Sequence, residues 1–283
     1  MRYLLADPAL TSRTPGEEFA RQVATNPGPQ VVARLAVCLP TTFPLAEHRP
    51  RYTVRHLLKT ATVGDEPVRY VTEPRPAGTP QTAGVKYDLT PEATFTAQWA
   101  EAELTELTAR VGLPPGLVDD PAMLAAFVDH RVVVRLCTVE NEALLQGTDD
   151  KAIAGLLNLP GLRRRTATGD LGVELTRAAA EVEEMGGSCD GIVAHPDRYW
   201  ELVHSGLLQR LNHVGVRVSR TRMISPDQVL LGDFRAAVTL LDTGESTITL
   251  TRGGGDAPDV VAASLRVGLA VHLPQHFLLL DLA

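Results

Sequence analysis

Cysteine is scarce in this sequence, and the three that occur share no spacing that would suit a metal. Cys38, Cys137 and Cys189 are spread through a chain of 283 residues. An odd number of widely separated cysteines argues against a disulfide framework and against a zinc site, and it fits a reducing compartment. We therefore expect a cytoplasmic protein without structural metal.

Long hydrophobic runs are also missing, and so is an excess of positive charge. No apolar run approaches the roughly 18 residues that span a bilayer, and the first residues contain no signal-peptide core. The net charge is −7, with only three lysines, at 59, 86 and 151, among 27 basic residues. These features exclude a membrane partner and argue against nucleic acid as a partner. A hydrophobic content of 44% over this length predicts one large domain or two interlocked domains.

The first 50 residues have the pattern of an arm rather than a core. Thr14, Pro15 and Glu17 form a capping box with proline in the first turn, which predicts a short helix to about Thr25. The acidic and basic residues of positions 1–30 balance, whereas an arm that binds a genome would be basic.

Residues 51–98 predict a long hairpin. Residues 51–59 and 85–96 are rich in strand formers, and the stretch between them, 67–84, is rich in proline and glycine. An isolated two-stranded hairpin is marginally stable in water, so this one needs a partner surface on its own chain or on another.

The rest of the chain alternates helical and extended patterns. The strongest is a helix over 120–146, introduced by an aspartate and Pro121 and followed by Gly147. We also expect helices over 170–185 and 196–204, and a loop over 206–213. Short strands are expected at 190–195, 214–218, 228–231, 236–241 and 247–251, followed by a largely extended segment over 260–282.

No set of residues assembles a convincing active site. Cys189 and His195 could act as nucleophile and base, but the sequence places no third residue to orient them. His272 and His276 have helical metal spacing, but their context contains Pro274 and indicates a strand. Glycines 253–255 lack the spacing of a phosphate loop, and arginines 163–165 are typical of a solvated loop. We therefore expect no catalytic residue, no cofactor and no metal.

The order of these elements resembles the major capsid protein of tailed phages, of the Hong Kong ninety-seven type, and its bacterial relatives, the encapsulins. The resemblance spans roughly 50–283, and it implies an α+β fold. The segments that carry it are 52–55, 119–131, 140–147, 155–158, 192–200, 230–234 and 265–274.

The resemblance divides the chain into named parts. It implies an N-terminal arm (1–50), an E-loop that reaches over a neighbour (51–98) and a P-domain with a spine helix (99–157). An A-domain (158–252) and a return to the P-domain (253–283) would follow. The family's covalent cross-linking is not expected, because residues 253–280 contain neither asparagine nor glutamate.

The resemblance also implies a function, which is a closed icosahedral shell of sixty copies that encloses a cargo enzyme. Third-family encapsulins fit best. The implied pore residues are Gln209, Arg210, Asn212 and His213, and the implied cargo-facing residues are Glu18, Phe19 and Gln22. Two alternatives stay open, a prophage capsid protein that packages DNA and a soluble cysteine-dependent enzyme that uses Cys189 and His195.

Overall fold

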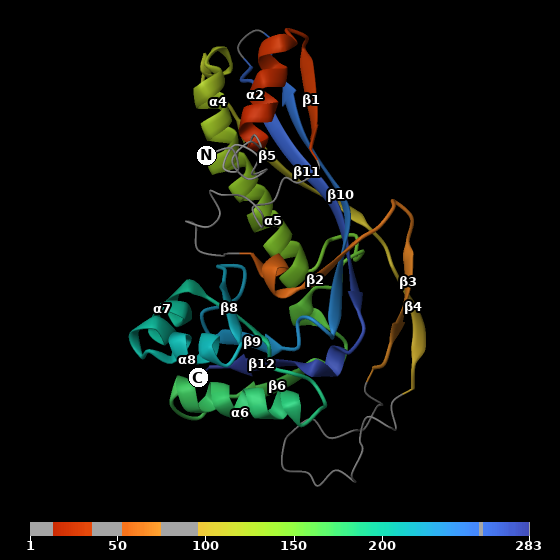
Figure 1. Ribbon diagram of the computed structural model, residues 1–283, viewed down its shortest axis with the longest axis vertical. Coiled ribbons are helices and arrows are strands. Elements are labelled where there is room, and N and C mark those ends of the chain that lie inside the picture. Colours follow the sequence, from red (N-terminus) through yellow and green to blue (C-terminus); the bar gives the residue numbers. More distant parts are fainter. Residues whose placement is uncertain (1–13, 36–52, 75–95, 255–256, 283) are drawn as a thin grey trace, which may run out of the picture. The chain divides into compact units, whose positions relative to one another are not determined.

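The computed structural model describes residues 14–35, 53–74, 96–254 and 257–282 (Figure 1). These residues form two compact units. The first is drawn from the described parts of Met1–Pro50, Glu106–Glu140 and Asp242–Val267. The second is drawn from the described parts of Arg51–Thr105, Asn141–Leu241 and Gly268–Ala283.

The first unit is built on a sheet with the strand order β1-β10-β11-β5. Its strands are β1 (Gln30–Leu35), β5 (Thr105–Gly112), β10 (Val238–Thr251) and β11 (Val260–Val271). Strands β1 and β10 are antiparallel, with Gln30 opposite Thr251 and Leu35 opposite Ser246. Burial alternates along β1, so one face of the sheet carries its apolar side chains inward. Helix α2 (Pro15–Thr25) lies beside helix α4 (Pro121–Phe127) in Figure 1, and the two are in contact.

Helix α2 and strand β1 contribute buried apolar side chains to this unit, and the division of the chain that names residues 1–50 an arm stays a prediction. The helix begins where the sequence predicts, because the Thr14 side chain accepts from the Glu17 backbone while Glu17 reaches back to the Thr14 backbone. Its apolar residues are fully or almost fully buried, with Phe19 at 0% and Val23 at 3% exposure.

The long helix over 120–146 is confirmed, with one feature that the periodicity does not predict. Asp120 caps α4 by accepting from the backbone amides of Ala122 and Met123. A π-helical turn (Val128–Val132) separates α4 from α5 (Val133–Gln146). Such turns insert an extra residue and shift the faces of the helix on either side of them.

The second unit contains a sheet with the order β6-β12-β9-β7-β8. Its strands are β6 (Arg163–Thr166), β7 (Gly191–Ala194), β8 (Arg217–Arg220), β9 (Gln228–Gly232) and β12 (Phe277–Asp281). The pairs β6–β12 and β7–β8 are parallel, whereas β9 is antiparallel to both of its neighbours. Helix α6 (Leu171–Glu183) packs on β12 and β9, and α7 (Pro196–His204) and α8 (Leu207–His213) lie together at one end (Figure 1).

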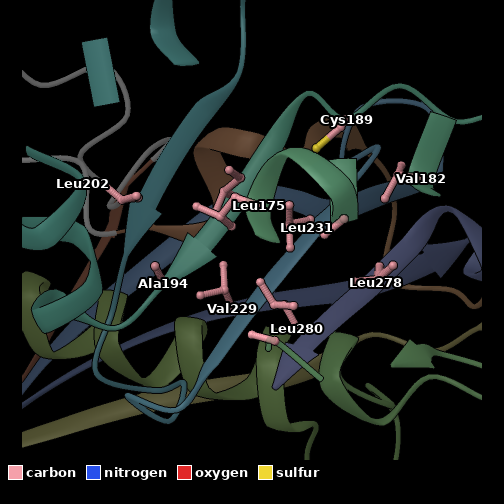
Figure 2. Packing of buried hydrophobic residues seen from close by; sticks show 12 residues of the cluster. Leu175, Val182, Cys189, Ala194, Leu202, Val229, Leu231, Leu278 and Leu280 are labelled. Atoms are coloured by element: carbon pink, nitrogen blue, oxygen red, sulfur yellow. The ribbon is translucent and has the colours of Figure 1, made fainter. Parts of the chain in front are cut away.

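The core of this sheet lies under helix α6. Figure 2 shows Leu175 and Val182 from the helix close to side chains of β9 and β12. The helical residues recur at three- and four-residue steps, while the strand residues alternate, so both periodicities point at the same apolar layer. The buried members of the cluster are Ala167, Leu175, Ala178, Val182, Cys189, Ile192, Ala194, Leu202, Val229, Leu231, Leu278 and Leu280.

Several expectations for this region are confirmed and two are wrong. The predicted helices over 170–185 and 196–204 and the predicted strand over 190–195 correspond to α6, α7 and β7. The segment 206–213 is not a loop but helix α8, which starts after Gly206 at a φ of 70°. The two strands expected over 236–251 are one 14-residue strand, β10.

The hairpin exists, but its strands lie elsewhere than predicted. Part of the first expected strand is a 3-10 helix (Val54–Leu57), followed by the short strand β2 (Lys59–Thr62). The paired strands are β3 (Val68–Thr72) and β4 (Gln98–Ala102), which form a two-stranded antiparallel sheet. Residues 85–95 of the expected return lie outside the described residues. None of the helices in the described ranges is both long enough and apolar enough to cross a membrane.

Candidate assembly surfaces

The ribbon formed by β3 and β4 is fastened to its own unit by one face. The ring of His272 is bonded through Nδ1 to the carbonyl oxygen of Val71 (2.9 Å) and through Nε2 to the hydroxyl of Thr239 (3.1 Å). The carbonyl oxygen of His272 accepts from the Thr72 hydroxyl (3.2 Å) and from the Glu73 backbone amide (2.8 Å). We call this set the His272 clasp.

Apolar contacts complete the fastened face. The ring of Tyr70 meets His272 edge-on, with centroids 5.4 Å apart. Ala102 of β4 is buried with Leu241 and Ala270, and Tyr70 packs against this small cluster. One face of the ribbon is therefore covered by residues of the same chain. The sequence pattern had left open whether the covering surface lies on this chain or on another.

The opposite face of the ribbon is exposed and carries a tryptophan. Val71 and Trp99 face each other across the two strands, and they are 40% and 70% exposed. The guanidinium of Arg69 lies 5.0 Å from the centre of the Trp99 ring, and Arg69 is paired with Glu101 in the register. A large exposed apolar pair with a polar surround is typical of a surface that another molecule covers. Trp99 lies three residues beyond the predicted return strand over 85–96, so the sequence pattern did not indicate it.

The three expected cargo-facing residues of helix α2 have different environments. Glu18 accepts from the guanidinium of Arg21 and from the side-chain amide of Gln22 (3.0 Å), so these residues form one polar network. Phe19 has no exposed surface and packs inside the first unit. Its side chain is therefore not available to a cargo, because it already holds α2 in place.

Helix α2 packs against helix α4, and its backbone at Gly16 approaches α4 very closely. The Gly16 amide donates to Oδ1 of Asp129 (2.8 Å), on the first turn of the π-helical segment. Burial raises the pKa of Asp129, while its hydrogen bonds with Thr14 and Gly16 act against that increase. A carboxylate at the N-terminus of α2 also satisfies a backbone amide that the helix leaves unpaired.

All four expected pore residues lie on helix α8, and none of them is buried. They are Gln209, Arg210, Asn212 and His213. Arg210 donates to the carbonyl oxygen of Ser205 (3.3 Å). The position of these side chains at a pore stays a prediction.

The arginines at 163–165 are used within the second unit. Arg163 is 2% exposed and donates to the carbonyl oxygens of Gln275 (3.0 Å) and Glu181 (2.8 Å). Arg165 bonds to the carboxylates of Glu174 and Glu181. The expectation of a solvated loop is wrong here, because this segment is strand β6 and only the side chain of Arg164 is mostly exposed (56%).

Cys189 and His195 do not form a nucleophile and base. Burial raises the pKa of the Cys189 thiol to about 12, so the reactive thiolate is not populated at neutral pH. His195 caps helix α7, and its Nδ1 accepts from the Asp197 amide (3.3 Å). Both residues have structural roles, which argues against the cysteine-dependent enzyme.

The remaining candidates also serve the fold. The Gly253 amide donates to Oδ1 of Asp259 (2.8 Å) in the turn between β10 and β11, so this turn is closed by its own aspartate. His272 forms the clasp, and His276 is buried. In the part of the chain that the structure describes, no three His, Cys, Asp or Glu side chains gather in a way that could hold a metal ion.

Comparison with known proteins gives a consistent result at the level of structure only. No family model matches the sequence, and no curated protein matches it. A structure of Mycobacterium phage Adephagia is similar with a TM-score of 0.59 at 14% identity, covering 85% of this chain and 93% of that one. A virus-like particle from Pyrococcus furiosus gives 0.56 at 13%, covering 81% and 92%. The capsid of an empty GTA particle gives 0.56 at 17%, covering 83% and 91%.

These likenesses cover most of this chain and almost the whole of each similar structure. They agree with the capsid fold that the sequence resembles. The chain therefore has the α+β fold of the tailed-phage major capsid proteins, of the Hong Kong ninety-seven type.

Proposed function

We propose that this chain is the shell protein of an encapsulin nanocompartment, in which sixty copies form a closed icosahedral shell around a cargo enzyme. The observation that carries the proposal is the ribbon β3–β4 in a chain with a capsid fold. One face is held by the His272 clasp, and the other presents Trp99 at 70% exposure. A fixed ribbon with an uncovered aromatic face is suited to bind a neighbouring copy, and repeated contacts of one kind that close produce a symmetric shell.

The charge of the chain supports a protein cargo rather than a packed genome. The chain carries a net charge of −7, and on helix α2 the basic Arg21 is neutralised by Glu18. A surface that holds nucleic acid needs unpaired basic side chains. In this proposal Glu18 and Gln22 face the cargo, and helix α8 lines the pore with Gln209, Arg210, Asn212 and His213.

The alternative is a capsid protein that packages DNA, which the likeness to a phage structure supports. The contents of the particle separate the two functions. Purified particles of the encapsulin type would contain protein protected from protease and would have the ultraviolet absorbance ratio of protein. A ratio near that of DNA would favour the capsid instead.

The assembly step has its own test in the variant Trp99→Ser. Native mass spectrometry and negative-stain imaging should show closed particles for the wild type and mostly dissociated chains for the variant. The matched control is Met123→Ser, which removes a large apolar side chain of similar exposure (61%) on helix α4 and leaves the ribbon intact. A wild-type chain that stays single at all accessible concentrations would refute the shell, and normal particles from Trp99→Ser would refute the role of the ribbon.

A further inference from the structure

Helix α8 and the turn that joins it to β8 carry charge of one sign at one end of the second unit (Figure 1). Residues 202–226, which contain both elements, include four arginines and no aspartate or glutamate, although acidic residues outnumber basic ones by 34 to 27 in the whole chain. Arg210 and His213 of α8 are exposed, and so is Arg217 at the first position of β8. We call these three side chains the basic surface.

The packing of α8 fixes which of its side chains reach the solvent. The three leucines of the helix pack against the apolar cluster under α6, whereas its four polar residues are all exposed. A glycine in the left-handed conformation bounds the helix on each side, Gly206 with a φ of 70° and Gly215 with a φ of 91°. Residues with a Cβ rarely adopt this conformation. The backbone beneath the basic surface is therefore held by the core and by a defined turn on either side.

The acidic side chains of the neighbouring elements have partners of their own. On helix α7, Glu201 is paired with Arg198 (2.9 Å). Asp197 lies 3.3 Å from the ring of His195. Asp190, which precedes β7, accepts from a backbone amide (2.7 Å). None of the three side chains of the basic surface forms an ion pair with an acidic residue in the ranges that the structure describes, so its positive charge is not cancelled locally.

Such a surface attracts small ions of negative charge. Unpaired charges of one sign raise the local concentration of counter-ions, and the effect grows where an opening is lined by several copies of them. In the proposed shell α8 lines the pore, so every copy around that pore adds its own basic surface. The guanidinium group of arginine suits phosphate and carboxylate oxygens, with which it forms paired hydrogen bonds.

We propose that this pore admits small anions in preference to cations, and that the substrate or product of the cargo enzyme is a phosphate or carboxylate compound. This inference deepens the proposed function and rests on it, because the selectivity requires several copies around one pore. Arg210 and Arg217 supply the permanent part of the charge, since a guanidinium group stays protonated in proteins.

The entry of charged probes into closed particles tests the selectivity. Particles of the full-length chain would be assembled around a fluorescent dextran that is too large to leave. Stopped-flow quenching would then follow three nitroxides of similar size, which carry a carboxylate, a trimethylammonium or a hydroxyl group. In about 0.01 M salt, the carboxylate nitroxide should enter the wild type roughly tenfold faster than the trimethylammonium nitroxide. In about 1 M salt, screening should bring the two rates within about threefold of each other.

A double variant identifies the residues that are responsible. With Arg210→Gln and Arg217→Gln together, the two charged nitroxides should enter at rates within about twofold of each other at low salt. The matched control combines Arg110→Gln and Arg131→Gln, which removes two exposed arginines of the first unit and should keep the wild-type preference. Because the wild type alone is compared for three probes at two salt concentrations, the test does not depend on how well the variants assemble.

The outcomes distinguish this inference from the proposed function. If closed particles form and the three nitroxides enter the wild type at equal rates, or if the double variant keeps the preference for the anion, the selectivity is wrong and the shell stands. If the particles contain nucleic acid that the double variant loses, the basic surface binds nucleic acid and the anion pore is wrong. If the wild type forms no closed particle, both the pore and the shell are wrong.

Discussion

The substitution Gly16→Ala tests how helix α2 is held in the first unit. A Cβ at position 16 would overlap the carbonyl oxygen of Ala125 and would lie 2.8 Å from Cγ and Oδ2 of Asp129. The obstacle includes backbone, which cannot turn away as a flexible side chain would. Helix α2 would have to move off α4, and the hydrogen bond from the Gly16 amide to Asp129 would lengthen or break.

Two opposing effects set the size of the change. Alanine favours the helix over glycine by about 1 kcal/mol. Overpacking a tight contact costs about 1–3 kcal/mol, and loss of a hydrogen bond to a charged group costs about 1.5–3 kcal/mol. The clash therefore outweighs the helix propensity, and we expect a net destabilisation of about 2–4 kcal/mol.

Urea-induced unfolding followed by circular dichroism would measure this difference. Gly112→Ala is the matched control, because Gly112 lies on β5 of the same unit and a Cβ there meets nothing within 4 Å. The control should unfold within about 1 kcal/mol of the wild type. If Gly16→Ala is as stable as Gly112→Ala, the close approach between α2 and α4 does not exist as described.

Three further predictions concern the second unit. Burial raises the pKa of Asp190 in the folded chain, so the contribution of Asp190 to stability falls as pH rises above the ordinary value of 3.8. Asp190→Asn keeps an oxygen for the Phe234 amide, and in thermal unfolding from pH 3 to 7 this variant should become more stable relative to the wild type as pH rises. A constant difference between the two would contradict the raised pKa. Burial would raise the pKa of Glu174, but Arg165 and Arg177 outweigh burial and lower it. The wild type should therefore lose stability as pH falls below 4.5, whereas Glu174→Gln should be less stable than the wild type at pH 7 and should lose less stability in acid. Equal stability profiles of the two proteins in acid would contradict this pairing. His272→Ala removes the two ring hydrogen bonds of the clasp and keeps the two to the backbone carbonyl oxygen. Hydrogen exchange of the β3 and β4 amides should become roughly 5–30 times faster, for a loss of about 1–2 kcal/mol. Unchanged exchange would show that the ring hydrogen bonds do not hold the ribbon.

The elements that the sequence predicts correctly have their signals close together in the chain. The capping box at Thr14, the aspartate and proline before α4, and the apolar periodicity of α6 each act within a few residues. The predicted positions of the hairpin strands were wrong, and β3 is bonded to His272, about 200 residues away in the sequence, a contact that no local pattern contains. Helix α8 was missed because it has only seven residues, so its leucines at 207, 208 and 211, which pack against the core cluster, make less than two turns of pattern.

The candidate surfaces divide in the same way. The polar residues of α8 and the polar pair Glu18 and Gln22 were named from the sequence, whereas Trp99 was not, because a tryptophan in a sequence is as well suited to a core as to a surface. Phe19 was placed on the surface, although packing within the first unit buries it completely.

By itself, the sequence determined the class of the molecule, which is an acidic α+β chain with a long helix, a ribbon and few reactive groups, since composition and short-range periodicity suffice for that. Only the tertiary structure decided which side chains are covered. In the folded chain Arg163 is buried and donates to backbone carbonyl oxygens, the Cys189 thiol lies in an apolar layer, and Trp99 is exposed. Burial depends on contacts between residues that are far apart in the sequence, and no local pattern contains that information.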